Sequence, residues 1–172
     1  MYSDFFWSTG MRAIRIGDND ANAAVFGPSE QAVLDEKNEL YTILDTGASY
    51  IYISALYFED FINMFFDVHG VDSDKYEATN STVTSECTGT GDYKSIYFLM
   101  GGQWLEVRPE DYVNFDKNAN LCKFLFKGID APFNIVGLPL YIDYYVSHFW
   151  GQSDEGTSMS FSSNGRDIKA AP

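Results

Sequence analysis

The segment Ile-Leu-Asp-Thr-Gly-Ala-Ser at 43–49 constrains the fold of this chain more than any other. An apolar run ends directly at Asp45, and Gly47 permits a backbone turn that other residues disfavour. A carboxylate at the end of a buried strand costs free energy unless hydrogen bonds hold it. We therefore expect main-chain N–H groups and the hydroxyls of Thr46 and Ser49 to hold the Asp45 carboxylate. An Asx-type turn at a strand end is the alternative.

The remaining apolar pattern predicts an all-β fold. Aromatic residues, which favour strands, make up 17% of the chain. Apolar runs with strand character lie at 7–16, 40–47, 49–55, 95–107, 122–129, 133–150 and 159–163. The run at 95–107 contains Gly101-Gly102 and is typical of a hairpin. It is not a phosphate loop, because no helix follows it directly.

One segment has clear helical periodicity, and it follows Ser54. Apolar residues recur at helical spacing from Leu56 to Phe66, and Gly70 ends the run. Ser54 is a suitable N-cap, and acidic residues lie early in the segment. We expect the aromatic stripe of this helix to pack in the core.

Polar segments connect these elements. Residues 17–31 predict a long loop with one short strand, and 70–94 predict a polar connection rich in Thr, Ser, Asp and Gly. Pro109 predicts one helical turn over 109–112. Residues 164–172 are expected to form a loose tail. The length of 172 residues favours one domain over 1–172, or one lobe of a larger protein.

The charge of the chain excludes several classes of partner. Eleven basic and 25 acidic residues give a net charge of −14, which repels nucleic acid and anionic membranes. The acidity fits either a solvated surface or adaptation to acidic surroundings. No apolar run is long enough for a membrane span, and the first 20 residues lack the pattern of a signal peptide.

The two cysteines, Cys87 and Cys122, do not form a CxxC pair, so a metal site is not expected. A disulfide or two free thiols remain open. Asn80 begins the sequon Asn-Ser-Thr, and together with the even cysteine count it favours glycosylation in a secretory compartment. His69 and His148 have no acid or cysteine at ligand spacing and do not indicate a site.

Five segments, taken in order, resemble the C-terminal lobe of the pepsin-like aspartic proteases, the family of pepsin and cathepsin D. The resemblance extends over residues 7–163. The segments are "ILDTGAS" at 43–49, "SALYFEDFINMFFDVHG" at 54–70, "SIYFLMGGQWLEVRPEDYV" at 95–113, "FNIVGLPLYIDYYVSHFW" at 133–150 and "SMSFSS" at 158–163. The fold that the resemblance implies is one lobe of an acid protease β-barrel with one main helix after the active-site loop.

The resemblance also implies roles for the residues of this loop. Asp45 is expected to be one of two catalytic carboxylates, and Thr46 to interlock with the loop of the other lobe. Gly47 is expected to shape the loop and Ser49 to hydrogen-bond the carboxylate. Gly137, preceded by two apolar residues, is expected to pass beside the loop.

Further expectations concern disulfides, cofactors and location. The resemblance places Cys87 and Cys122 where the second lobe of such enzymes has its disulfide. It implies no metal and no organic cofactor. It implies a peptide substrate, and it agrees with the secretory pathway, a lysosome-like vacuole or the extracellular space.

The chain departs from the family pattern in several places. It contains one Asp-Thr-Gly where the family has one loop in each of two lobes, and it lacks the tyrosine-bearing flap of the N-terminal lobe. Leu138 stands where the family often has an acid, and Ala48 stands where second lobes usually have Thr. The connection at 18–40 is longer than usual.

These departures lead to two functional hypotheses. The first is an aspartic endopeptidase half-molecule that is inactive alone, because the chemistry needs two coupled carboxylates and the second comes from an N-terminal lobe or a second chain. The second is an inactive protease-like subunit with a structural or binding role in a larger assembly. A homodimer that pairs two copies of Asp45 is the least favoured arrangement.

Overall fold

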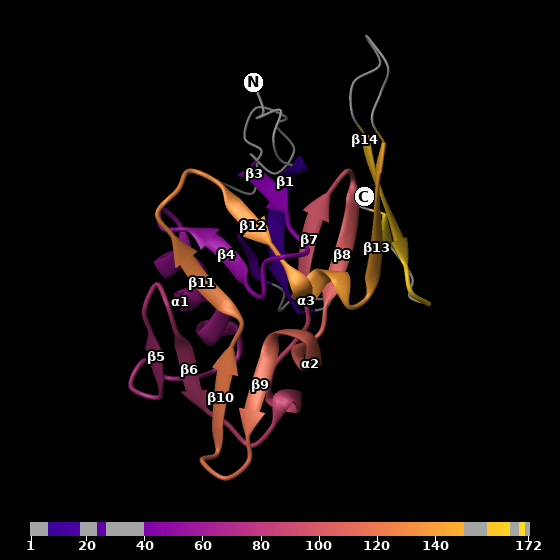
Figure 1. Ribbon diagram of the computed structural model, residues 1–172. Helices are drawn as coiled ribbons and strands as arrows, with labels where there is room; N and C mark the ends of the chain where they lie inside the picture. The colour runs from indigo at the N-terminus through magenta and orange to yellow at the C-terminus, as the bar shows by residue number, and fades with distance from the viewer. Residues whose placement is uncertain (1–6, 18–23, 27–39, 150–157, 166–168, 171–172) are drawn as a thin grey trace.

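The main body of the protein is a nine-stranded β-sheet (Figure 1). The computed structural model describes residues 7–17, 24–26, 40–149, 158–165 and 169–170. The strands of the large sheet are β1 Ser8–Ile16, β2 Ala24–Phe26, β3 Leu40–Leu44, β4 Ile51–Ser54, β7 Ile96–Met100, β8 Gln103–Val107, β11 Phe126–Ile129, β12 Asn134–Val136 and β15 Lys169–Ala170. Their order is β11-β4-β12-β3-β1-β7-β8-β15, with β2 paired to β1.

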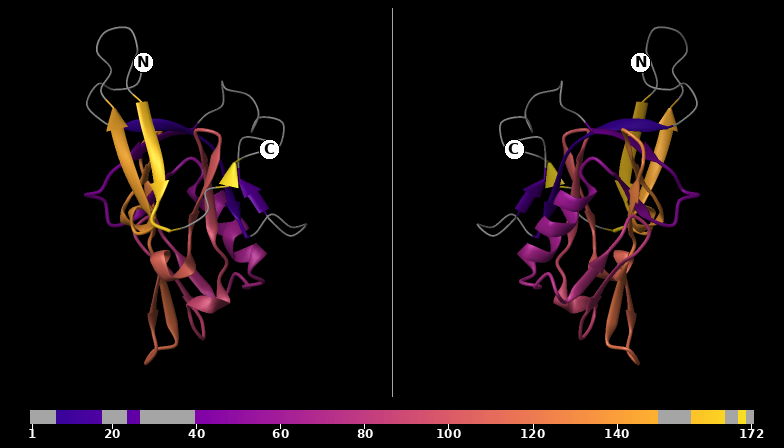
Figure 2. Two further views of the ribbon diagram at one scale, coloured as in Figure 1. Left: turned by 90° about the vertical axis from the view of Figure 1, so that its right-hand side faces the viewer. Right: turned by 90° about the vertical axis from the view of Figure 1, so that its left-hand side faces the viewer.

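Two smaller sheets and three α-helices complete the described part of the fold. One sheet has the order β5-β6-β10-β9 and the other is the ribbon β13-β14. The strands are β5 Tyr76–Ala78, β6 Val83–Glu86, β9 Val113–Asp116, β10 Leu121–Phe124, β13 Tyr144–Phe149 and β14 Ser158–Ser163. The helices are α1 Phe58–Val68, α2 Pro109–Tyr112 and α3 Leu138–Tyr141, with a 3₁₀ turn, η3, at Thr90–Asp92. Figure 2 shows α1 and the β13-β14 ribbon on opposite sides of the large sheet. The prediction of an all-β fold with one main helix is confirmed.

Helix α1 supplies much of the core. Phe61 and Phe65 are fully buried, and Phe65 makes edge contacts with Phe124 and Phe126 at ring distances of 5.4 and 5.3 Å. Burying a Phe side chain contributes roughly 2–3 kcal/mol, so this aromatic cluster fixes α1 against the strands. The predicted core role of the aromatic stripe is confirmed, as is the end of the helix before Gly70, which has φ +64°.

The start of α1 differs from the prediction. The N-cap is Tyr57, not Ser54, and Leu56 is 72% exposed. Ser54 instead ends β4, where its hydroxyl donates to the carbonyl of Ala131 at 2.7 Å and accepts from the amide of Leu56 at 3.4 Å. Ser54 therefore stabilises the turn between β4 and α1. Because its hydroxyl is used in these hydrogen bonds, it does not cap the helix.

Several short elements also differ from the sequence pattern. The polar connection at 70–94 contains β5, β6 and η3, and the expected strand at 122–129 is two strands that meet at Leu125. The expected loose tail contains β15, in which Lys169 pairs with Trp104. The hairpin at Gly101-Gly102 is confirmed, since both residues have the positive φ that a tight hairpin turn requires.

The segment at 17–31 contains the short strand that the sequence predicted, β2. The expectation that the connection at 18–40 is unusually long falls mainly on residues outside the described ranges. The sequence also predicts a polar loop at 151–158, of which residues 151–157 lie outside these ranges and Ser158 begins β14.

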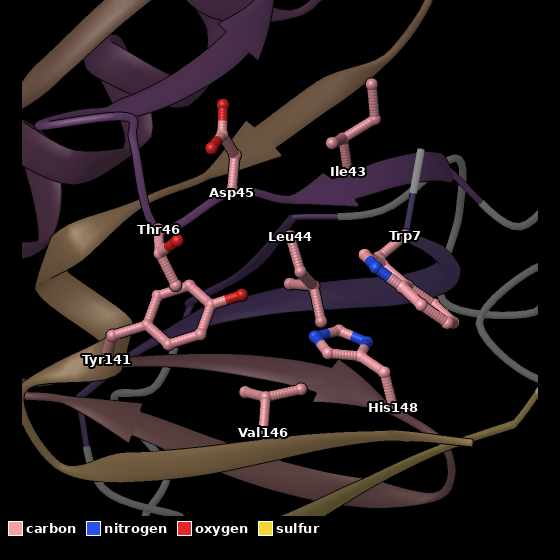
Figure 3. A pocket seen from close by; sticks show the side chains of 8 residues that line it. All are labelled: Trp7, Ile43, Leu44, Asp45, Thr46, Tyr141, Val146 and His148. Carbon is pink, nitrogen blue, oxygen red and sulfur yellow. The ribbon is translucent and has the colours of Figure 1, made fainter. Parts of the chain in front are cut away.

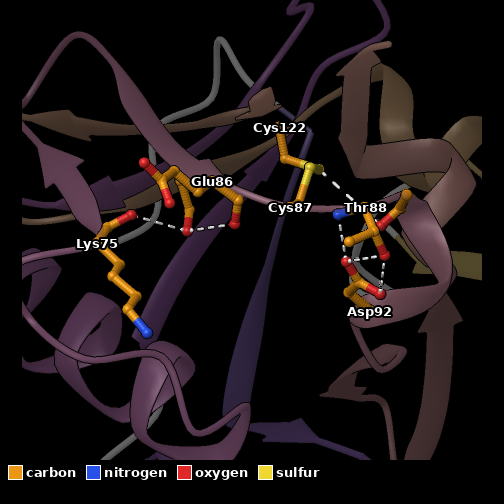
Figure 4. Close-up of a disulfide and its surroundings, with 8 residues drawn as sticks. Lys75, Glu86, Cys87, Thr88, Asp92 and Cys122 are labelled. Atoms are coloured by element: carbon orange, nitrogen blue, oxygen red, sulfur yellow. Dashed lines mark hydrogen bonds between the residues drawn. A yellow bond between two sulfur atoms is a disulfide. The ribbon is translucent and has the colours of Figure 1, made fainter. Parts of the chain in front are cut away.

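The disulfide expected from the family resemblance is present. Cys87 and Cys122 are bonded, with their Cα atoms 5.8 Å apart (Figure 4). The bond joins the end of β6 to β10, where the Cys87 amide also donates to the carbonyl of Asn120 at 3.1 Å. Beside it, the amide of Thr88 donates to Asp92 at 2.6 Å. The disulfide therefore closes a loop of 35 residues in sequence, which restricts the unfolded chain.

Candidate active site

The parallel pairing of β3 and β12 positions the Asp45 loop. Val136 on β12 is in register with Leu44 on β3, so the carboxyl ends of both strands meet at one edge. The amide of Asp45 donates to the carbonyl of Val136 at 3.2 Å, and the amide of Leu138 donates to the carbonyl of Ala48 at 2.7 Å. The loop after β3 and the turn after β12 therefore hold each other by main-chain hydrogen bonds.

Gly137 lies at the closest approach between these two segments. A Cβ atom at this position would lie 2.2 Å from the carbonyl oxygen of Ala48 and 2.6 Å from that of Tyr50. Both are backbone atoms with no freedom to withdraw. The chain therefore needs glycine here for steric reasons alone, which is the local basis for the tight packing of β12 against the loop.

The Asp45 carboxylate lies in an exposed turn. Its Oδ1 accepts a hydrogen bond from the amide of Gly47 at 2.8 Å, and a Cβ atom on Gly47 would lie 3.2 Å from the same oxygen. Asp45, Thr46 and Ser49 are all exposed. Within the described residues, Ser49 makes no hydrogen bond to Asp45, so the expected hydroxyl contact is not formed. The side chains of Asp45 and Thr46 are therefore accessible from outside the described part of the protein.

A pocket of about 430 Å³ opens beside Asp45 (Figure 3). It is lined by Trp7, Ile43, Leu44, Asp45, Thr46, Tyr141, Val146 and His148. Figure 3 shows Asp45 and Thr46 on one side of it, and Val146 and His148 of β13 on the other. The rings of Trp7 and His148 lie 4.3 Å apart. The pocket therefore separates the candidate catalytic loop from the β13-β14 ribbon.

Two polar atoms in this pocket have no hydrogen-bond partner among the described residues. They are the hydroxyl of Tyr141 and Nδ1 of His148, and both atoms are buried. Burial raises the pKa of Tyr141 to about 12, and the negative charge of Asp45 adds to the effect. Burial lowers the pKa of His148. A buried polar group without a hydrogen bond lowers the stability of the fold by about 1–3 kcal/mol. The pocket therefore contains two polar atoms that could still form hydrogen bonds.

The sequence interpretation did not include Trp7, Tyr141 or His148 in the site. His148 has no ligand-like neighbour in sequence, and the structure gives it a different setting. It lies on the same face of β13 as Tyr144 and Val146, four and two residues earlier, and this alternation is the signal that could have indicated an inward position.

The remaining candidate residues lie elsewhere. Asn80 is exposed in the turn between β5 and β6, and its carbonyl accepts from the amide of Gly128 at 2.9 Å. His69 ends α1: its Nδ1 bonds the carbonyl of Phe65 at 2.6 Å and its Nε2 accepts from the amide of Lys94 at 2.9 Å. His69 is therefore a structural residue.

The described residues show neither a metal-binding cluster nor a membrane-spanning helix. They contain no group of three His, Cys, Asp or Glu side chains arranged to hold a metal ion. In the same residues, no helix combines the length and apolar character needed to cross a bilayer.

A comparison with protein families tests the resemblance seen in the sequence. The model of the family "Eukaryotic aspartyl protease" matches residues 2–158. The chain therefore belongs to the eukaryotic aspartyl protease family, as its resemblance to pepsin-like enzymes predicted. A comparison with curated proteins returned no match. Membership of this family supports a hydrolytic, protease-type function.

Proposed function

We propose that this chain, over residues 1–172, is one lobe of an aspartic endopeptidase, and that Asp45 is one of its two catalytic carboxylates. The observation that carries the proposal is the position of Asp45, which lies on an exposed glycine turn at the joined carboxyl ends of β3 and β12. In this proposal the amide of Gly47 holds the carboxylate, Gly137 packs closely against the loop, and the exposed Thr46 and Ser49 belong to the same loop.

The chemistry requires a second carboxylate. Two carboxyl groups about 3 Å apart cannot both ionise, so the pair retains one proton. The ionised member removes a proton from a bound water, which attacks the peptide carbonyl, and the protonated member donates to the carbonyl oxygen. Asp45 can perform either role but not both at once. The single lobe is therefore inactive in this proposal, and it needs no metal or organic cofactor.

The second carboxylate is proposed to come from an N-terminal lobe, on the same polypeptide or on another chain. The surface around Asp45 is suited to such a contact. Leu138 and Ile142 are large apolar residues with exposed fractions of 49% and 47%. The unpaired atoms of Tyr141 and His148 would gain hydrogen-bond partners there. A face of this kind is stabilised by a partner, and Thr46 lies where it could interlock with the partner's loop.

A second candidate function is an inactive subunit that keeps the protease fold. It is favoured by Leu138, which takes the place of an acid directly after Gly137, and by the absence of a Ser49 contact to the Asp45 carboxylate within the described residues. In that case a partner would bury the Asp45 face without supplying a carboxylate. Pairing of two copies of this chain across Asp45 is the third and least favoured arrangement.

A secretory location completes the proposal. The disulfide is stable in an oxidising compartment, and the exposed sequon at Asn80 is open to glycosylation. Together with the acidic composition, these features favour the secretory pathway, a lysosome-like vacuole or the extracellular space.

The experiment that tests the catalytic role compares two variants in the assembled enzyme. Asp45→Asn keeps the shape of the side chain and should lower peptide hydrolysis at acid pH by at least about a hundredfold. Asp74→Asn removes the same charge from an exposed turn and should leave the rate unchanged. Unchanged hydrolysis after Asp45→Asn would reject the role of Asp45 and favour the inactive subunit.

A further inference from the structure

A second pair of carboxylates lies buried away from Asp45. Asp111 belongs to α2, and Asp143 belongs to the corner between α3 and β13. Each residue is 6% exposed, although Asp side chains are almost never buried unless they are paired. One guanidinium, that of Arg108, lies against both, and it is itself about one-third exposed. The pair joins two elements that are 32 residues apart in sequence.

The Arg108 guanidinium contacts three carboxyl groups through different nitrogen atoms. Arg108 Nη2 donates to Asp143 Oδ1 at 3.3 Å, and Nε donates to Asp143 Oδ2 at 3.4 Å. The same Nε lies 3.3 Å from Asp111 Oδ2, which accepts no hydrogen bond within the described residues. The remaining nitrogen, Nη1, pairs with Glu110 at 2.6 Å. One positive charge therefore faces three carboxyl groups, two of them buried.

We propose that Asp111 and Asp143 share one proton, and that this acid pair is a pH-sensitive latch between α2 and the α3–β13 corner, closed in acid and loosened towards neutral pH. A proton between the two carboxyl groups converts a repulsive contact into a hydrogen bond and leaves Arg108 to balance the remaining charge. Loss of that proton leaves two buried negative charges with an incomplete counter-charge.

The titration of Asp111 supports this arrangement. Burial raises its pKa to about 6, and the hydrogen bond and charge of Asp143 add to the rise, while Arg108 opposes it. A folded pKa above the unfolded value of about 3.8 means that protonation favours folding. The resulting stability is fully present below about pH 4 and is lost as the pH rises through about 6.

The other charged groups on neighbouring elements are occupied elsewhere. Asp92 of η3 accepts from the amide and hydroxyl of Thr88, and Asp116 of β9 accepts from the amide of Asn118. Glu106 of β8 accepts from the hydroxyl of Ser95. The groups that act on Asp111 are Asp143, Arg108 and Glu110, so the titration belongs to this cluster.

The latch is connected to the candidate active site through α3. Asp143 ends the turn that begins at Gly137, where the chain packs against the Asp45 loop, and Tyr141 between them lines the pocket. The amide of Asn164 also donates to the carbonyl of Asp143 at 2.8 Å, which links the latch to the end of β14. Opening it at neutral pH would loosen the segment from Gly137 to Asp143, whose Leu138 amide donates to the carbonyl of Ala48 in the loop. The inference does not depend on catalysis by Asp45.

The test compares urea unfolding of the 172-residue chain between pH 4 and 7.5 with two variants. Asp111→Asn removes the titrating group but can still hydrogen-bond, and Asp116→Asn removes one charge from an exposed position. In the unmodified chain and in Asp116→Asn, the unfolding equilibrium constant should rise with pH by about tenfold or more relative to Asp111→Asn. The same pH dependence in Asp111→Asn would overturn the latch.

A direct measurement covers the case in which Asp111→Asn does not fold. The carboxyl ¹³C resonance of Asp111 can be followed by NMR in the unmodified chain. A titration midpoint near 6 for Asp111 is the expected result. A midpoint near 4 for Asp111 would show that burial beside Asp143 does not hold its proton, and would overturn the inference.

Discussion

Gly137 and Ala48 approach each other so closely that a single methyl group on Gly137 would lie 2.2 Å from the Ala48 carbonyl oxygen. The contact joins the end of β12 to the turn that carries Asp45. The hydrogen bond from the Leu138 amide to the same carbonyl, at 2.7 Å, spans the same two segments. The geometry of the candidate catalytic loop therefore depends on a residue that lies 92 positions away in sequence.

Replacing Gly137 by Ala should destabilise the chain by about 3 kcal/mol. Overpacking typically costs about 1–3 kcal/mol, and the added methyl group would clash with the carbonyl oxygens of both Ala48 and Tyr50. Urea denaturation measures the change. Gly91→Ala is the matched control, because a Cβ atom there would have no neighbour within 4 Å. Equal stabilities for the two variants would contradict the packing described here.

Removing the hydroxyl of Tyr141 should stabilise the isolated lobe or leave it unchanged. This hydroxyl is buried and unpaired among the described residues, so Tyr141→Phe removes a desolvation cost of about 1 kcal/mol. Tyr112→Phe is the comparison, because the Tyr112 hydroxyl donates to the carbonyl of Lys94 at 2.6 Å and its loss should cost about 1 kcal/mol. An equal loss of stability in both variants would contradict the prediction, because it would mean that the Tyr141 hydroxyl makes a stabilising hydrogen bond.

His69 should make the fold less stable as the pH falls. Burial lowers its pKa below 6.5, and its Nε2 accepts the Lys94 amide, which a protonated ring cannot do. Its contribution is complete above pH 6.5 and is lost as the pH falls through the folded pKa. The proton NMR titration of His69 should therefore have a midpoint below 6.5, and a midpoint above that value would refute the prediction.

His69 and Asp111 act in opposite directions. Protonation of Asp111 favours folding, whereas protonation of His69 opposes it. The two contributions are complete in separate pH ranges, that of Asp111 below about pH 4 and that of His69 above pH 6.5, so their pH slopes in the unfolding free energy should oppose each other.

Reduction of the Cys87–Cys122 disulfide should cost about 4 kcal/mol, according to the entropy of closing a loop of 35 residues. Urea denaturation with and without a reducing agent measures the loss, and the double variant Cys87→Ser/Cys122→Ser should reproduce it. A reduced chain as stable as the oxidised one would show that β6 and β10 are held by their hydrogen bonds alone.

Much of the framework could be predicted from the sequence. The alternation in 7–16 and the apolar runs at 40–47 and 49–55 correspond to β1, β3 and β4, because side-chain periodicity directly reflects burial on a sheet. The helix was found by its aromatic stripe. The observed start of the helix differs from the prediction because Ser54, a residue type that favours N-cap positions, donates its hydroxyl to the carbonyl of Ala131 instead. Ala131 is 77 residues away, so local sequence does not reveal this contact.

The site could be predicted only in part. The position of Asp45 followed from one motif, since a strand end and a glycine turn are local features. The pocket combines residues from β3, α3 and β13, and the roles of Tyr141 and His148 depend on how these elements pack. The same holds for Asp111 and Asp143, which belong to separate segments and meet only through tertiary structure.

In the proposed enzyme, this chain supplies one carboxylate to a pair that a second lobe completes. Native mass spectrometry of the material that hydrolyses peptides at acid pH, with a pepstatin-like inhibitor bound, tests it most directly. The expected result is one inhibitor for each copy of this chain together with one further lobe, on the same or another polypeptide, that contains a second Asp-Thr-Gly or Asp-Ser-Gly loop. An active, inhibitor-binding species that contains a single copy of these 172 residues and no second carboxylate loop would contradict it.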